Sequence, residues 1–179
     1  MANFDIMKAF YQSLLVLFLS LVIQKAICQD TIYHPTTSYS FIDEFEKGYY
    51  SQLTGVEINY ICNTTLYGSI EDWLGTPYRY SGTTRKGVDC SAFVRAVYQE
   101  TFEHSFHGNS LAYYRASTPV KKEHLEEGDL VFFRINRNKT ISHVGVFLGN
   151  DKFAHASRSR GVVISDLKSP YYRKHFVRG

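Results

Sequence analysis

The chain reads Gly128-Asp-Leu-Val-Phe-Phe133, and a few residues later Ser142-His-Val-Gly-Val-Phe-Leu-Gly149. Both runs are rich in β-branched and aromatic residues and are bounded by glycine, which is typical of strands separated by turns. The same pattern continues to Leu167 and predicts four strands that form an antiparallel meander, with tight connections at Gly149-Asn150-Asp151 and Arg160-Gly161. These strands are expected at Leu130–Arg134, Ile141–Leu148, Phe153–Ser157 and Val162–Leu167.

Helical periodicity precedes the strands. From Cys90 to Phe102, apolar residues recur at steps of three and four, which predicts a helix with one buried face. Two earlier helices are expected at Ile42–Gln52 and Thr64–Leu74, the second with Asn63 as its cap. Helices first and strands afterwards indicate an α+β fold rather than alternating βαβ units.

Length and composition limit the class of protein. The chain has 179 residues, of which 44% are hydrophobic and 21% are charged. This length suits one domain, and the composition is that of a globular protein rather than a disordered one. The formal net charge of +3 is too small for the basic surface that nucleic-acid binding usually requires. We therefore expect no nucleic-acid partner.

The N-terminal segment is typical of an export signal. Its apolar run, Leu14–Ile23, is about ten residues long, whereas a membrane-spanning helix needs about 20. We predict a signal at residues 1–28, a lead segment at 29–62 and the main domain at 63–179. Cleavage before Gln29 and lipidation of Cys28 both remain open, as does a retained anchor helix. In each case the protein is expected to be exported.

The three cysteines divide by position. In an oxidising compartment, two exported thiols such as Cys62 and Cys90 could form a disulfide. Cys90, however, begins a helix, where unpaired N–H groups favour the thiolate and are expected to lower its pKa. A thiolate is the nucleophilic form of cysteine, so Cys90 is a candidate for covalent catalysis. A buried structural cysteine is the alternative.

Two of the seven histidines, His143 and His155, fall within predicted strands. We expect a three-residue turn at Leu148–Asn150, with Gly149 in an unusual backbone conformation. That turn would place the histidines directly opposite each other on one face, as a base and its orienting partner. A two-residue turn at Asn150–Asp151 would place them on opposite faces instead. A structural pair, or a zinc site that includes Cys90, are the alternatives.

Five motifs resemble those of the NlpC/p60 family of cell-wall cysteine endopeptidases, in the same order and at similar spacing. The resemblance covers about residues 70–177. The motifs are Gly75-Thr-Pro-Tyr-Arg-Tyr-Ser-Gly82, Gly87-Val-Asp-Cys-Ser-Ala-Phe-Val94, Gly128-Asp-Leu-Val-Phe-Phe133, Ser142-His-Val-Gly-Val-Phe-Leu-Gly149 and Phe153-Ala-His-Ala-Ser157.

The resemblance implies a papain-like fold in which the helix that carries the cysteine packs on the sheet that carries both histidines. It implies that Cys90 is the nucleophile, that His143 is the base and that His155 orients His143. Tyr78 would help to stabilise the oxyanion. A cofactor and a metal ion are not expected.

The resemblance also implies the substrate and the setting. The family cleaves peptide bonds in peptidoglycan stems or cross-links, so we expect a monomer that acts in the cell envelope. Contact with a membrane is expected only through a lipid on Cys28. Free carboxylates on such substrates would suit arginines, and Arg79, Arg158 and Arg160 are the candidates. A secreted toxin with the same chemistry, or an inactive envelope binding lipoprotein, are the alternatives.

Overall fold

The computed structural model describes residues 39–58, 64–135 and 140–179, and residues 42–179 form one compact unit. The predicted export signal with Cys28, and also Cys62 and Asn63, lie outside the described residues. Within the described ranges, no helix has both the length and the apolar character needed to cross a bilayer.

The three helices predicted from periodicity are confirmed to within three residues at each end. Helices α3 and α4 bury most of their apolar positions, and in α4 Phe93, Val94 and Val97 are fully buried. Phe45 and Tyr49 of α2 are exposed, as is Phe102 of α4. Two shorter α-helices and one 3₁₀ turn complete the set in the described chain. The helices are α2 (Tyr39–Thr54), α3 (Thr64–Trp73), α4 (Cys90–Phe102), α5 (Ser110–Ala116), η1 (Lys122–His124) and α6 (Pro170–His175).

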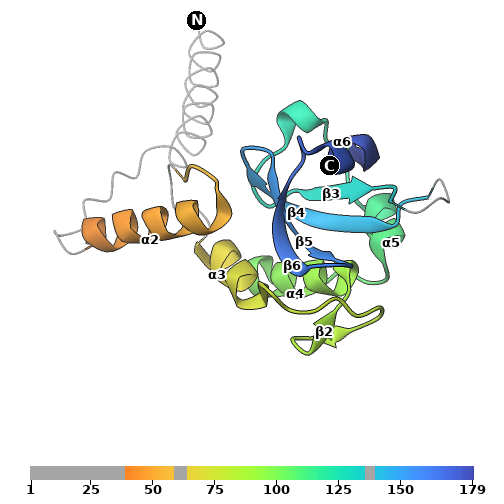
Figure 1. The fold of residues 1–179 in the computed structure, drawn as a ribbon, viewed down its shortest axis with the longest axis horizontal. Helices are drawn as coiled ribbons and strands as arrows, with labels where there is room; N and C mark the ends of the chain where they lie inside the picture. The colour runs from red at the N-terminus through yellow and green to blue at the C-terminus, as the bar shows by residue number, and fades with distance from the viewer. Residues whose placement is uncertain (1–38, 59–63, 136–139) are drawn as a thin grey trace, which may run out of the picture. The chain divides into compact units, whose positions relative to one another are not determined.

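The predicted meander is also present, and it forms four of the five strands of one antiparallel sheet. The strands follow the order β6-β5-β4-β3-β7 in the sheet (Figure 1). The fifth strand, β7, pairs with β3 and was not predicted. A further two-stranded ribbon, β1 with β2, lies within residues 78–88, where the glycines predicted only a loop. The strands are β1 (Thr83–Thr84), β2 (Gly87–Val88), β3 (Leu130–Phe133), β4 (His143–Gly149), β5 (Lys152–Ser157), β6 (Gly161–Asp166) and β7 (Phe176–Arg178).

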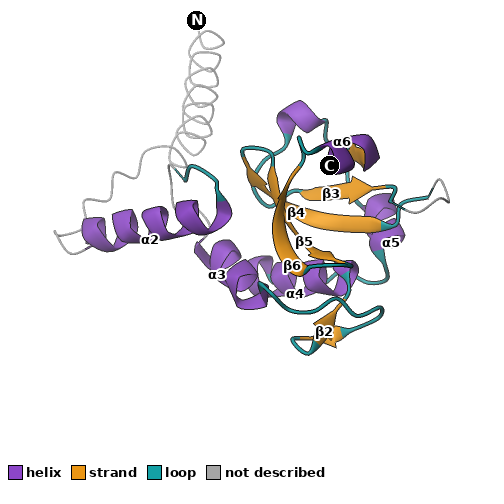
Figure 2. Cartoon of the chain, in the orientation of Figure 1, coloured by secondary structure: helices purple, strands orange, loops and turns teal. Residues whose placement is uncertain are grey.

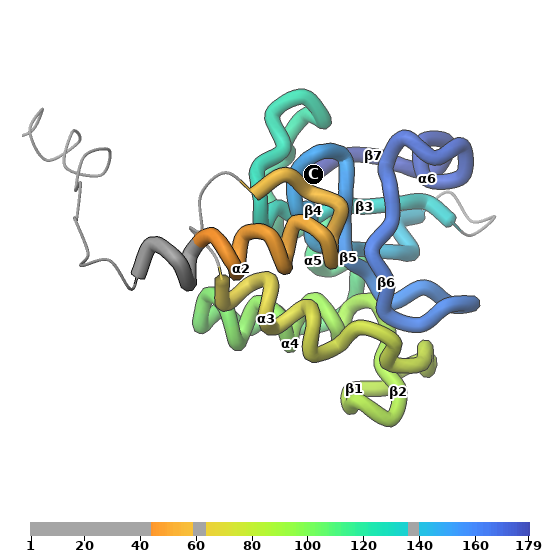
Figure 3. The backbone as a smooth tube through the Cα atoms, turned by 60° about the vertical axis from the view of Figure 1, so that its left-hand side comes forward, coloured from red at the N-terminus to blue at the C-terminus, as the bar shows by residue number. Residues whose placement is uncertain are grey.

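The two faces of the sheet bury different apolar layers. Helix α4 covers one face, and α3 lies beside α4 (Figures 2 and 3). On that face the core includes Val144, Val146, Ala154 and Ala156 of the sheet and Phe93, Val94 and Val97 of α4. The opposite face carries a smaller cluster of Val131, Phe133, Phe147, Phe153, Leu167 and Tyr172. This is the helix-on-sheet arrangement that the α+β prediction described.

The β4–β5 hairpin corrects one prediction. Its connection is the two-residue turn at Asn150–Asp151, with φ of 47° and 60°, and not the three-residue turn expected at Leu148–Asn150. Gly149 does take the expected unusual conformation, with φ of 99°. The register shifts between Phe147 and Gly149, so that Leu148 is an extra residue in a β-bulge. The bulge adds one residue to β4 between the two histidines, so both side chains lie on the same face of the sheet.

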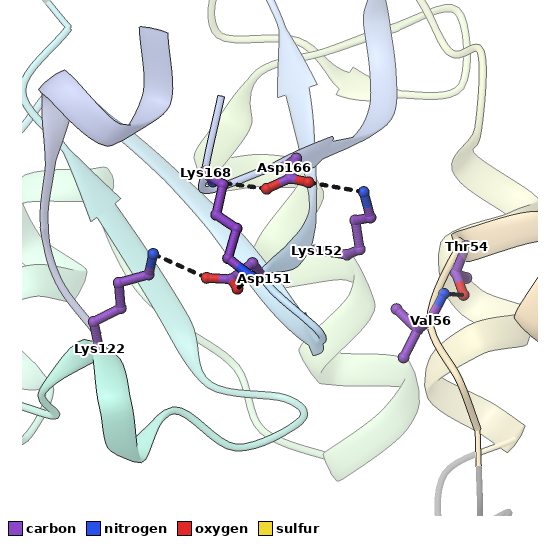
Figure 4. Close-up of polar contacts among 7 residues, drawn as sticks. All are labelled: Thr54, Val56, Lys122, Asp151, Lys152, Asp166 and Lys168. Carbon is purple, nitrogen blue, oxygen red and sulfur yellow. Dashed lines mark hydrogen bonds and ion pairs between the residues drawn. The ribbon is translucent and has the colours of Figure 1, made fainter. Parts of the chain in front are cut away.

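Ion pairs hold this turn in place. Asp151 pairs with Lys122 of η1 at 2.9 Å and with Lys168, which follows β6, at 2.6 Å (Figure 4). Lys152 and Asp166, directly opposite each other on β5 and β6, form a third pair at 3.0 Å. Such partly exposed pairs contribute little stability individually, but together they fix where the bulged hairpin lies on the rest of the sheet.

Candidate active site

Cys90 is the first residue of α4, and Asp89 is the helix cap. The Asp89 carboxylate accepts hydrogen bonds from the Ala92 N–H and the Ser91 hydroxyl, both at 2.8 Å. Cys90 is a free thiol with 7% of its surface exposed. The backbone N–H groups of Cys90, Ser91 and Val144 are directed at its sulfur. The sulfur therefore lies against β4 one residue beyond His143.

The electrostatics of this thiol differ from the sequence-based expectation. Burial, followed by the negative charge of Asp89, raises the pKa of Cys90 to about 11. The three backbone N–H groups lower it, as the helix terminus predicted, but they do not outweigh the loss of solvation. The prediction of a lowered pKa is therefore wrong for the free protein. The thiol is protonated at neutral pH.

The structure brings His143 and His155 into direct contact. Nε2 of His143 lies 2.8 Å from Nδ1 of His155, and both rings are almost completely buried. The pair is diagonal rather than directly opposite, because the register continues from Val146–Ala154 to place Gly145 opposite His155. A Cβ at Gly145 would lie 3.1 Å from the His155 Cβ and only 2.7 Å from a backbone oxygen. The glycine thus permits the close pairing of β4 with β5 beside the two histidines.

Both histidines are neutral in this environment. Burial, with a smaller effect from the positive charge of Arg158, lowers the pKa of His143 to about 4. Burial also lowers the pKa of His155, with further contributions from His143 and Arg160. Since Nε2 of His143 is bonded to His155, Nδ1 is the nitrogen of His143 that remains for a proton transfer. Among the described residues, no hydrogen bond joins Cys90 to His143 in this resting arrangement.

The remaining nitrogen of His155 has partners that the sequence analysis missed. Its Nε2 lies 3.0 Å from the Ser165 hydroxyl and 3.0 Å from the Tyr172 hydroxyl. Arg160 donates to the same Ser165 oxygen at 2.9 Å. One signal was available, because Ser165 lies two positions from Val163, the residue that pairs with His155, and so shares its face. Tyr172 lies on α6, which no periodicity revealed.

This network suits one tautomer of the two rings. If His143 is to accept a proton at Nδ1, its Nε2 must carry hydrogen and donate to a bare Nδ1 of His155. His155 is then protonated at Nε2, where the Ser165 and Tyr172 oxygens are available as acceptors. Ser165 can accept from both His155 and Arg160 because a hydroxyl oxygen has two lone pairs.

Tyr78 lies near Cys90, as the resemblance implied, and both line a cavity of about 590 Å³. Burial and the nearby Cys90 raise the pKa of Tyr78, so its hydroxyl keeps the proton that an oxyanion would need. The guanidinium of Arg158 lies 5.9 Å from the Tyr78 ring centre and hydrogen-bonds to its hydroxyl.

A second cavity, of about 490 Å³, lies at the histidines and shares Ser142 and Arg158 with the first. Arg160 also lines this second cavity, whereas Arg79 lines neither. Among the described residues, no group of three His, Cys, Asp or Glu side chains is arranged to hold a metal ion.

Comparisons with known proteins identify the family to which this fold and sequence are similar. The model of the NlpC/P60 family matches residues 75–179. The "Murein DD-endopeptidase MepS/Murein LD-carboxypeptidase" of Escherichia coli K12 is 40% identical over 105 residues, which are 59% of this chain and 55% of that protein. The "Probable endopeptidase NlpC" of the same organism is 40% identical over 111 residues, 62% of this chain and 72% of that protein.

A solved structure of an NlpC/P60 family protein from Bacillus cereus is similar in fold. It superposes with a TM-score of 0.59 at 30% identity, and the match covers 64% of this chain and 38% of that one. The chain spans about half the length of the first of these relatives, 55%. The residues matched by the family model, 75–179, include all those that line the two cavities.

Proposed function

The chain belongs to the NlpC/P60 family, and from that premise we propose that it is a peptidoglycan endopeptidase. It would hydrolyse stem-peptide or cross-link amide bonds through an acyl-enzyme on Cys90. The observation that carries this proposal is the buried 2.8 Å contact between His143 and His155. His143 directly precedes Val144, the residue of β4 whose backbone N–H is directed at the sulfur of Cys90. The murein endopeptidase name of the similar Escherichia coli protein supports the choice of substrate.

The first half of the reaction forms a thioester. Nδ1 of His143 takes the proton from the Cys90 thiol, and the sulfur attacks the carbonyl carbon of the substrate. The oxygen becomes an oxyanion, which accepts hydrogen bonds from the Cys90 backbone N–H and the Tyr78 hydroxyl. His143 then gives its proton to the nitrogen of the scissile bond. The C–N bond breaks, and the amine leaves while the acyl group stays on sulfur.

The second half returns the enzyme to its starting state. A water molecule gives a proton to Nδ1 of His143 and attacks the thioester carbon. The C–S bond breaks, the carboxylic acid product leaves, and Cys90 recovers a proton from His143. His155 stabilises the protonated form of His143 in both halves by accepting from its Nε2–H.

The protonation states of the resting enzyme imply that the proton leaves Cys90 only when substrate is bound. With the pKa of Cys90 near 11 and that of His143 near 4, the neutral pair is favoured before substrate arrives. Proton transfer therefore accompanies attack, when the oxyanion donors stabilise the negative charge that moves from sulfur to oxygen. A resting neutral thiol is also protected from oxidation, which acts on thiolates.

The protein would act in the cell envelope after export, as a monomer without a cofactor. We extend the proposal to the export signal at residues 1–28, with cleavage or lipidation at Cys28. N-terminal sequencing and mass spectrometry of the protein from its native host would distinguish these two forms of processing. Retention of residues 1–28 would overturn both.

Digestion of purified sacculi tests the activity. The wild-type protein should release muropeptides that mass spectrometry detects, and both Cys90→Ser and His143→Ala should release none. His124→Ala is the matched control, because His124 is an exposed histidine that lines neither cavity. Identical products from wild type and Cys90→Ser would overturn the proposal. Retained binding of Cys90→Ser to sacculi, without any wild-type cleavage, would favour the inactive binding protein instead.

A further inference from the structure

The charged side chains that line the cavity beside the histidines are all positive among the described residues. Two arginines, Arg158 and Arg160, line it, and no Asp or Glu is present among the described residues of its lining. Nor does either arginine form an ion pair with a carboxylate in the described part of the chain. Their hydrogen bonds go to neutral hydroxyls, those of Tyr78 and Ser165. Two cations without an anion make this cavity a place of positive potential.

A further polar group in the cavity lacks a partner. The Ser169 hydroxyl oxygen is buried and has no hydrogen-bond partner among the described residues, although Ser169 lines the cavity. Ser169 occupies the cap position of α6, but its side chain makes no capping hydrogen bond. Buried hydroxyls without partners are uncommon in folded proteins, and each needs an explanation. A rotation of the Ser169 side chain toward the cavity would give this hydroxyl a ligand oxygen as its partner.

The proposed reaction determines which part of the substrate reaches this cavity. The acyl group stays on Cys90, whereas the leaving nitrogen must lie at His143, which protonates it. The two cavities adjoin at Ser142 and Arg158, and His143 lines the second one. The part of the substrate beyond the cleaved bond therefore extends into the cavity of the two arginines.

We infer that this cavity binds the residue that leaves as an amine, and that Arg158 and Arg160 select a residue with a free α-carboxylate. The inference rests on the proposed function and specifies the substrate at the same site. The α-carboxylate and the leaving nitrogen are attached to one carbon, so a nitrogen at His143 places the carboxylate at the mouth of the arginine cavity. A volume of about 490 Å³ is ample for one amino-acid residue.

Carboxylate binding would also assist the chemistry. The charge of Arg158 is one cause of the low basicity of His143. An anion beside Arg158 offsets that charge, which makes His143 a better base only when the correct substrate is in place. Selection and activation would then depend on the same contact.

A matched pair of synthetic substrates tests the inference. The two stem peptides are identical except that the residue after the cleaved bond ends in a free α-carboxylate or in a primary amide. The wild-type protein should prefer the carboxylate by about 10- to 100-fold in kcat/KM, the range for a charged hydrogen bond. Arg158→Gln and Arg160→Gln should each reduce that preference, and the double variant should bring it close to unity.

The ratio between the two substrates is the informative quantity. Loss of the Arg160 bond to Ser165 could slow both reactions, but it would slow them equally. Arg115→Gln is the matched control, because Arg115 is exposed and lines neither cavity, and it should keep the full preference. Equal cleavage of both substrates by the wild-type protein would overturn the inference while leaving the proposed function intact.

A binding measurement keeps the two proposals distinguishable if no cleavage occurs. Titration of the Cys90→Ser protein with D-alanine, followed by NMR, should shift the resonances of Ser169 and of residues 157–160. D-Alaninamide should not shift them, and the double arginine variant should respond to neither compound. Absence of any carboxylate-dependent shift would overturn the inference whatever the outcome of the cleavage assay.

Discussion

Removing both hydroxyls that face His155 should slow catalysis without removing either histidine. In the double variant Ser165→Ala with Tyr172→Phe, the Nε2–H of His155 has no acceptor among the described side chains. A buried donor without a partner costs about 1–3 kcal/mol. His155 avoids that cost by moving its proton to Nδ1, where it opposes the Nε2–H of His143. The base then cannot become protonated without two N–H groups facing each other.

This penalty converts directly to a rate. At about 1.4 kcal/mol per factor of ten, a cost of about 1–3 kcal/mol lowers kcat by about 5- to 150-fold. Each single variant leaves one acceptor at 3.0 Å, so we expect each to lose less than about a third of that free energy. The assay is kcat on a purified muropeptide, accompanied by ¹⁵N NMR of the imidazoles to identify the tautomer.

The control for the tyrosine must lie outside both cavities. Tyr171 is unsuitable because it lines the arginine cavity, so the control is Tyr49→Phe on α2, where Tyr49 is 42% exposed and lines neither cavity. This variant should leave kcat unchanged. The reasoning fails if the double variant keeps kcat within twofold of wild type, or if the ¹⁵N shifts show that His155 retains its Nε2 proton while kcat falls.

Three further predictions concern charge at the site. Because the pKa of His143 is lowered from 6.5 to about 4 on folding, the unfolded chain binds more protons between these values, and stability should fall as pH decreases from about 6.5 to 4. The urea midpoints of unfolding at pH 7 and pH 5 measure this decrease. A steeper decrease in His143→Gln than in wild type would contradict the prediction. Because the pKa of Cys90 is about 11, its alkylation by iodoacetamide should accelerate about tenfold per pH unit from pH 7 to 9, and a plateau there would indicate a resting ion pair instead. Asp89→Asn should keep the helix cap but shift that alkylation profile to lower pH. Asp89→Ala should in addition lose about 1 kcal/mol of stability in urea unfolding. Equal alkylation profiles for wild type and Asp89→Asn would show that the charge of Asp89 does not affect the thiol.

The parts of the fold that the sequence predicted are those with a local signal. Helix α4 repeats its apolar residues at helical steps, and the strands of the meander are short apolar runs, the last three of them separated at Gly149 and Gly161, so neighbouring residues were enough to identify them. Strand β7 has three residues, all half-buried, and exists because β3 has a free edge beside it. A pattern of three residues has no measurable period, so only the tertiary contact defines this strand.

The candidate site divides in the same way. Cys90, His143 and His155 could be chosen because their residue types and positions are visible in the sequence. The pKa of Cys90 could not, because a helix terminus lowers it by a local effect while burial raises it by an effect of the whole fold. The contact of His155 with Tyr172 depends on α6, which brings Tyr172 to the sheet face opposite α4. Contacts between segments that are distant in the chain produce no regular residue spacing, so they cannot be predicted from the sequence pattern.

The hairpin between the histidines shows how a correct conclusion can rest on a wrong turn. Two residues on paired antiparallel strands share a face only if one lies an even number of positions from the residue that pairs with the other. A two-residue turn without a bulge would make that number odd for the two histidines. The bulge at Leu148 supplies the extra residue. Its signal is present in the sequence, because Gly149, Asn150 and Asp151 are three consecutive residues of the types that tolerate positive φ, and all three adopt it. Two such residues complete the turn, so the third predicts an irregularity in the strand before it.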